Sequence, residues 1–185
     1  ILESIRKETK NVFTIGNPLD EKTTFGPIAS KKQFERVREY LVIGKKEGAN
    51  QQTLTTSGTT PESGFFLPPT IFNNAHSQMS ISQEEIFGPI LSVISFKTDD
   101  EAIQIANDVN YGLAATAWTK DVSRARRLAR DLEAGSVDIC ATTTLGASLA
   151  TLSGEPFGAS GHGIVGGIHG LNPYLRSKAV QIITD

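Results

Sequence analysis

The order of apolar and polar residues along the chain predicts alternating helices and strands. Apolar residues three or four positions apart predict helices that begin after Ser30 and that cover residues 99–108 and 122–133. Short apolar runs predict strands over residues 90–96, 114–119 and 136–140. Because helices separate these strands, the pattern is typical of an α/β fold in which crossover helices join parallel strands.

The predicted helices carry signals for their ends and faces. Ser30 and Gln33 form a capping box at the start of the first helix, and we expect Gly44 and Gly48 to end it. The helix over residues 122–133 is expected to turn four apolar residues inward and four arginines outward: Val122, Ala125, Ala129 and Leu132, and Arg124, Arg126, Arg127 and Arg130. We interpret the arginine face as a solvated flank rather than a phosphate site.

The composition excludes several classes of protein. The chain of 185 residues carries 18 basic and 20 acidic side chains, so its net charge of -2 gives no field that attracts nucleic acid or an anionic membrane. No stretch approaches the roughly 18 apolar residues that span a bilayer, and residues 1–6 lack the apolar core of a signal peptide. The single cysteine excludes an internal disulfide. We therefore expect a cytoplasmic protein with neither nucleic acid nor a membrane as its partner.

The most informative motif is Glu-Glu-Ile-Phe-Gly-Pro at residues 84–89, directly before a predicted strand. Two adjacent carboxylates at the mouth of a buried strand are unfavourable unless hydroxyl groups or positive charge meet them. The Gly-Pro pair forces a turn that fixes the preceding side chains. Glu85 can then accept hydrogen bonds from vicinal hydroxyls of a ligand, while Phe87 offers a flat face. The alternative is a solvated glutamate pair that caps a short helical turn.

The glycine-rich residues 154–163 resemble a phosphate-binding loop or a nucleophile elbow, but the neighbouring sequence supports neither. A dinucleotide loop needs its glycines directly after a strand, and no convincing strand precedes these. The segment also lacks the second glycine of a nucleophile elbow, which argues against a serine hydrolase. Phe157 in this segment is either a ligand contact or a loop aromatic that plugs the core.

No catalytic or metal-binding residue can be named from local sequence. Cys140 ends a predicted apolar strand with no histidine, lysine or arginine beside it to favour the thiolate, so we expect a buried, unreactive thiol. His76, His162 and His169 lack the spacing of metal ligands, and no metal site is expected.

Six segments, taken in order, resemble the markers of the aldehyde dehydrogenase superfamily. They are Gly-Asn-Pro-Leu-Asp at 16–20, Gly-Phe-Phe-Leu-Pro-Pro-Thr-Ile at 64–71, the motif at 84–89, Ala-Asn at 106–107 with Tyr-Gly-Leu-Ala-Ala at 111–115, Leu-Glu-Ala-Gly at 132–135, and Tyr174 with Lys178 and Val180. The resemblance covers nearly the whole chain and lies in the C-terminal part of the catalytic domain. It implies a three-layer α/β fold with a parallel sheet.

The resemblance also implies that residues 1–185 are a partial catalytic domain. In the family, the nucleophilic cysteine and the general-base glutamate both lie upstream of the region matched by Ile1. The coenzyme-binding domain is likewise absent from the matched region. The implied enzyme oxidises a small-molecule aldehyde to a carboxylic acid with NAD or NADP, through a cysteine thioester.

Three residues take roles in the family pattern. The resemblance places Glu85 on the nicotinamide ribose, Phe87 beside the nicotinamide, and Phe157 in the wall of the aldehyde tunnel. Asp138, Cys140 and Ala159 depart from the pattern, since the family usually has tryptophan, asparagine and glycine there. These departures leave open a non-catalytic truncated or scaffold protein that retains the family fold.

Residues 174–185 are expected to form an oligomerisation segment. Val180 and Ile182 alternate with Ala179 and Gln181, a period of two that suits a half-buried strand at a sheet edge. Such an edge can be completed by another chain. Similar dehydrogenases use their C-terminal strand in dimer or tetramer assembly, which implies a homo-oligomer. The alternative is a strand that closes its own domain.

Overall fold

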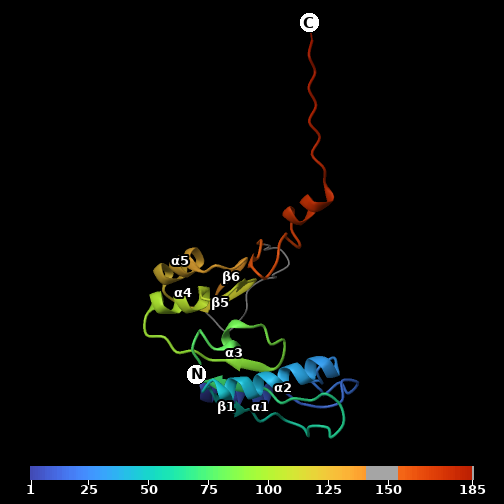
Figure 1. Cartoon of the computed structure of the whole chain (residues 1–185), viewed down its shortest axis with the longest axis vertical. Helices are drawn as coiled ribbons and strands as arrows, with labels where there is room; N and C mark the ends of the chain where they lie inside the picture. The colour runs from blue at the N-terminus through green and yellow to red at the C-terminus, as the bar shows by residue number, and fades with distance from the viewer. Residues whose placement is uncertain (141–153, 185) are drawn as a thin grey trace. The chain divides into compact units, whose positions relative to one another are not determined.

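The computed structural model describes residues 1–140 and 154–184 (Figure 1). It divides into two compact units, Ile1–Phe96 and Lys97–Asp185. The first unit contains α1 (Leu2–Val12), α2 (Lys31–Lys46), β1 (Asn50–Thr53), β2 (Thr70–Asn73), α3 (Ser80–Gln83) and β3 (Ile90–Ser92). The second contains α4 (Asp99–Asn107), β4 (Tyr111–Gly112), β5 (Ala114–Trp118), α5 (Val122–Asp131), β6 (Ser136–Cys140), β7 (Phe157–Gly158) and the 3-10 helix η1 (His169–Tyr174).

The core of the first unit lies between α2 and a mixed sheet of three strands. In the order β1-β2-β3, β1 is antiparallel to β2, and β2 is parallel to β3. Val37 of α2 and Phe72 of β2 are completely buried at the centre of this core. A Cβ atom at Gly44 would lie 2.7 Å from the ring of Phe72, so this glycine allows helix and strand to approach closely.

The start of α2 agrees with the sequence, and its end does not. The hydroxyl of Ser30 accepts a hydrogen bond from the backbone N–H of Gln33 at 3.3 Å, which confirms the predicted N-cap. The helix continues through Gly44 to Lys46, so the prediction that Gly44 ends it was wrong. Gly48, with a φ of 96°, follows the end of the helix in the left-handed conformation that glycine tolerates.

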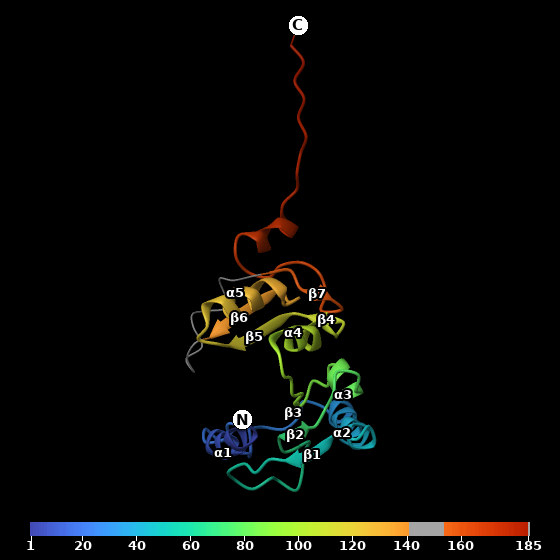
Figure 2. The same cartoon turned by 90° about the vertical axis from the view of Figure 1, so that its left-hand side faces the viewer.

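The second unit contains the predicted parallel pair of strands. In β5 and β6, Ala114 lies opposite Ser136 and Trp118 lies opposite Cys140, and α5 forms the crossover between them (Figure 2). This confirms the β-α-β part of the prediction. A short antiparallel pair, β4 and β7, brings Gly112 opposite Phe157. The α/β class is confirmed, although the described strands form three small sheets rather than one parallel sheet.

Burial in the second unit is slight. Within its described residues, only Gly112 and Cys140 are buried. Ala125 and Leu132 are half-buried as predicted, but Val122 and Ala129 are exposed, so that part of the predicted face of α5 was wrong. Several large apolar side chains on and around β4, β5 and α5 are also exposed: Leu113, Trp118, Val122 and Phe157.

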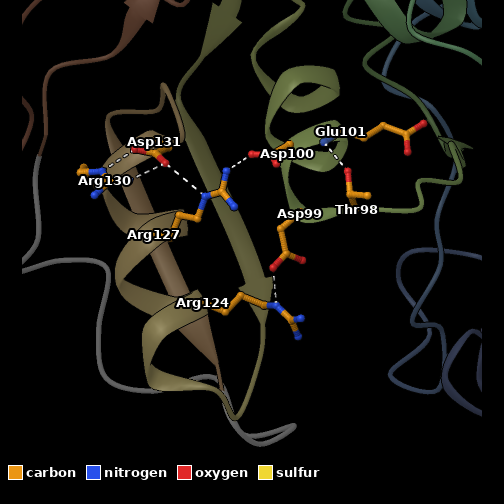
Figure 3. A network of polar contacts seen from close by, with 8 residues as sticks. All are labelled: Thr98, Asp99, Asp100, Glu101, Arg124, Arg127, Arg130 and Asp131. Atoms are coloured by element: carbon orange, nitrogen blue, oxygen red, sulfur yellow. Dashed lines mark hydrogen bonds and ion pairs between the residues drawn. The ribbon is translucent and has the colours of Figure 1, made fainter.

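Ion pairs connect α4 and α5 (Figure 3). Arg124 of α5 donates to the carboxylate of Asp99 at 2.8 Å, and this bond raises the pKa of the Arg124 guanidinium. Arg127 pairs with Asp100, and also with Asp131 at 3.6 Å. Arg124, Arg126 and Arg130 are exposed, as predicted, whereas Arg127 is half-buried. The arginine face also binds the acidic first turn of α4. The network drawn in Figure 3 also includes Thr98, Glu101 and Arg130.

The predicted C-terminal strand is absent from the described chain. Residues 175–184 form neither helix nor strand and their side chains are exposed. Val180 is 71% exposed and Ile182 is 81% exposed. The strand prediction was therefore wrong for this structure of a single chain, and the assembly role of residues 174–185 stays a prediction. No helix of the described chain is long and apolar enough to cross a membrane.

Candidate functional site

Glu85 and Phe87, the two predicted cofactor-binding residues, lie on the turn between α3 and β3. Ile86 between them is buried in the core of the first unit and anchors the turn. Its two neighbours are exposed, and Phe87 leaves 78% of its surface open. Phe87 also has a φ of 56°, which is uncommon for a bulky residue and marks a strained backbone. The structure therefore presents both predicted side chains from one constrained turn.

The backbone of this turn is held by side chains from α2. The amide nitrogen Nε2 of Gln33 donates to the carbonyl oxygens of Ile86 at 2.9 Å and of Phe87 at 3.1 Å. Gly88 continues the turn against Val37, where a Cβ atom on the glycine would lie 2.6 Å from the valine Cγ2. A larger residue at position 88 would displace the turn from the helix. The close packing of the turn against α2 therefore requires glycine at this position.

The two adjacent glutamates have different surroundings. The hydroxyl of Tyr40 donates to the carboxylate of Glu84 at 2.5 Å, and Arg36 donates to that hydroxyl at 3.4 Å. The hydrogen bond to Glu84, followed by burial, raises the pKa of Tyr40. Arg36 also donates to the backbone oxygen of Glu85 at 3.2 Å. The Glu85 carboxylate has no hydrogen bond or ion pair within the described residues, so it is the one free to meet a ligand.

A pocket of about 330 Å³ opens at the turn. Glu85 and Phe87 both line it, together with apolar residues of α3 and β3. Ser82 also lines this pocket, and its hydroxyl oxygen is buried without a hydrogen-bond partner in the described chain. The sequence analysis missed Ser82, because a single serine in a short polar helix carries no distinguishing signal.

Phe157, the predicted tunnel residue, belongs to the second unit. It lies on β7 and is 45% exposed. It lines a pocket of about 360 Å³ with Asn110, Tyr111 and Glu133. A Cβ atom at Gly112 would lie 2.7 Å from the Cβ of Phe157, so this glycine is needed for the close pairing of β4 and β7. Glu85 and Phe87 thus share one pocket, and Phe157 lies in a pocket of the other unit.

Asn107, one of the marker residues, has a structural role. Its Nδ2 donates to the backbone oxygen of Asp131 at 2.8 Å, and its Oδ1 accepts from the backbone N–H of Glu133 at 3.0 Å. Both partners lie where α5 ends and the chain turns towards β6. The asparagine side chain therefore fixes the end of α4 to the end of α5.

Cys140 is buried at the end of β6, as predicted. Its backbone oxygen accepts a hydrogen bond from Thr119 at 3.0 Å, which extends the pairing of β5 and β6. Nothing in its described surroundings marks it as a nucleophile. Among residues 1–140 and 154–184, no three His, Cys, Asp or Glu side chains gather where they could hold a metal ion.

Residues 1–180 match the model of the aldehyde dehydrogenase family. The chain belongs to this family. An aldehyde dehydrogenase-like protein of Schizosaccharomyces pombe is 40% identical over 184 residues, which cover 98% of the chain and 36% of that protein. A protein of Staphylococcus saprophyticus named as an aldehyde dehydrogenase is 41% identical over 180 residues, 94% of the chain and 36% of its own length. The chain thus spans about a third of the length of these curated relatives.

Solved aldehyde dehydrogenases share the fold of the chain. The betaine aldehyde dehydrogenase of Staphylococcus aureus, in complex with NAD+, has a TM-score of 0.82 at 33% identity and matches 96% of this chain and 35% of that one. A mutant of aldehyde dehydrogenase C from Pseudomonas syringae, in complex with NAD+ and octanal, has a TM-score of 0.83 at 34% identity. That match covers 97% of this chain and 37% of the other. These matches confirm the predicted superfamily and the predicted fold class.

Proposed function

We propose that this chain is the part of an NAD(P)-dependent aldehyde dehydrogenase that orients the cofactor and lines the aldehyde tunnel. The complete enzyme oxidises an aldehyde to a carboxylic acid through a cysteine thioester. The nucleophile and the base for hydrolysis come from outside the chain. Membership of the family and the NAD+ complexes of its solved relatives support this proposal.

The observation that carries the proposal is the free carboxylate of Glu85 beside the exposed ring of Phe87. A carboxylate without an internal partner can accept hydrogen bonds from two vicinal ribose hydroxyls. An aromatic ring next to it offers a face to the nicotinamide. The cofactor, when bound, accepts the hydride. Glu85 and Phe87 fix the plane of the nicotinamide with respect to the aldehyde, which is a positioning contribution to catalysis.

Phe157 is assigned to the wall of the aldehyde tunnel. Its half-exposed ring at a pocket of about 360 Å³ provides apolar surface for a small aldehyde. Ala159 lies in the same pocket, at the position where the family usually has a glycine. The added methyl group narrows the space beside Phe157, so we expect it to affect the choice of aldehyde.

The proposal includes a homo-oligomeric enzyme in a cytoplasmic setting. Residues 174–185 supply the contact between subunits, and the exposed Val180 and Ile182 form its apolar face. Burial of such side chains against a second subunit is favourable, because it removes apolar surface from water.

The test is an assay of a full-length dehydrogenase that carries this segment. Reduction of NAD or NADP, followed by absorbance over a panel of aldehydes of different length, should detect turnover. Phe157→Ala should change the KM for long and short aldehydes unequally and leave the affinity for the cofactor unchanged. A folded full-length protein that reduces neither cofactor with any aldehyde would instead support the alternative, a scaffold that retains the family fold.

A further inference from the structure

One face of α2 contacts residues 84–88 of the turn that carries Glu85 and Phe87. The four side chains on this face follow the spacing i, i+3, i+4 and i+7, which brings them to one side of a helix: Gln33, Arg36, Val37 and Tyr40. Their partners are five consecutive residues, 84–88. We call these four α2 residues the clamp face.

The clamp face binds the turn mainly through its backbone. The carbonyl oxygens of Glu85, Ile86 and Phe87 each accept a hydrogen bond from a side chain of α2. Three consecutive carbonyls held in this way leave the turn few alternative conformations. The hydrogen bonds also hold Phe87 in its left-handed conformation, which the backbone alone disfavours.

Tyr40 connects the clamp face to the carboxylates. Its ring is buried in the core that also contains Ile86, and its hydroxyl binds Glu84 of the turn. The hydroxyl accepts from Arg36 and donates to Glu84, so it fixes the position of the Glu84 carboxylate. Without the hydroxyl, Glu84 is free to swing and its negative charge can approach that of Glu85.

We propose that Gln33 and Tyr40 are positioning residues for hydride transfer. Their side chains bind the turn, and they act by fixing the direction of Glu85 and Phe87. The inference rests on the proposed role of Glu85. It assigns to α2 a function beyond packing, since the same helix face that closes the core also sets the geometry of the cofactor contact.

The experiment measures single-turnover hydride transfer in the full-length enzyme. Tyr40→Phe removes only the hydroxyl, and Gln33→Met keeps the length of the side chain while removing its two donated bonds. Each should slow hydride transfer about tenfold, the effect of a small displacement of a reacting group. The KM for the aldehyde should stay within about twofold of the parental value. Lys32→Met, an exposed change beside Gln33, is the matched control and should transfer hydride at the parental rate.

A double-mutant cycle separates positioning from general destabilisation. If Tyr40 acts through Glu84, then Tyr40→Phe should slow hydride transfer in the parent but have little further effect in Glu84→Gln. Independent effects that multiply would overturn the role of Tyr40. If Tyr40→Phe fails to fold, Gln33→Met carries the test, because Gln33 lies at the surface of the core.

The outcomes also distinguish the inference from the proposed function. Parental hydride transfer in both Tyr40→Phe and Gln33→Met, together with slow transfer in Glu85→Gln, would refute the clamp and leave the role of Glu85 intact. Parental rates in all three variants would refute the role of Glu85, and with it the clamp.

Discussion

Replacing Glu85 by glutamine tests the role of the carboxylate with little disturbance of the fold. The substitution keeps the size of the side chain and removes its charge. Glu85 is exposed, and its carboxylate has no partner in the described chain, so the free energy of unfolding should change by less than about 0.5 kcal/mol. Any larger effect on the reaction then reports on the cofactor and not on stability.

The expected magnitude follows from the hydrogen bonds that we propose between the Glu85 carboxylate and the ribose. A hydrogen bond to a charged group contributes roughly 1.5–3 kcal/mol. If that contribution serves orientation, hydride transfer in Glu85→Gln should be slower by a factor of roughly 10 to 100. The dissociation constant of the cofactor should rise by a smaller factor than the rate of hydride transfer falls, because we expect other parts of the enzyme to bind the rest of the dinucleotide.

The assay compares two quantities in the full-length enzyme. Rapid mixing gives the rate of the first hydride transfer, and a titration of intrinsic fluorescence gives the dissociation constant. Glu39→Gln is the matched control, since it removes the same charge from an exposed position of α2 outside the clamp face. Hydride transfer at the parental rate in Glu85→Gln would reduce Glu85 to a surface residue of the turn.

Four other outcomes test separate parts of the molecule. The chain alone should not oxidise aldehydes, because no activated nucleophile can be named in it, and NAD-dependent turnover that Cys140→Ala abolishes would overturn this expectation. Deleting residues 180–185 from the full-length enzyme should lower its mass in light scattering, and a folded oligomer of unchanged mass would show that the segment does not join subunits. The hydrogen bond to Glu84 raises the pKa of Tyr40 above its usual value of about 10. Its stabilising effect is therefore complete below that pH and is lost as the pH rises through the raised pKa, so the difference in Tm between the parent and Tyr40→Phe should shrink at alkaline pH; a difference independent of pH would contradict this. Arg127→Gln should lower Tm slightly at low salt and less at high salt, as expected for exposed ion pairs, and an effect that salt does not change would point to a packing role instead.

The elements that local sequence determines were predicted well. The cap at Ser30 depends on a residue three positions away, and the structure contains it. The β5-α5-β6 unit depends on apolar runs separated by an amphipathic helix, and its parallel pairing is present. In both cases the deciding residues lie within one element or its direct neighbours.

The predictions that failed depend on distant residues. Gly44 was interpreted as the end of a helix, but its absent side chain makes room for Phe72, which is far along the chain. Val122 was predicted to be buried, but it is exposed, because the described residues of the second unit form little buried core. The strand predicted near Val180 needs a neighbouring strand to pair with, and residues 175–184 pair with none of the described strands.

The candidate site shows the same limit. The residues alone predicted that Glu85 of the glutamate pair meets a ligand, but they gave no contact that distinguishes its surroundings from those of Glu84. Tyr40, which engages Glu84, is distant in sequence, and only the fold shows that this contact leaves Glu85 free. The family resemblance assigned the cofactor contact to Glu85, and that assignment stays a prediction.

The conformation of Phe87 makes its turn a place where stability and activity compete. A non-glycine residue with a φ of 56° destabilises the folded backbone, by roughly 1–2 kcal/mol for the left-handed region. A search for stabilising substitutions would therefore select glycine at this position, and the selected protein would resist heat better while it lost the ring that we propose lies beside the cofactor. Under the proposed role of Phe87, thermostability screens should leave residue 87 unchanged, because the strained backbone there would serve the cofactor contact.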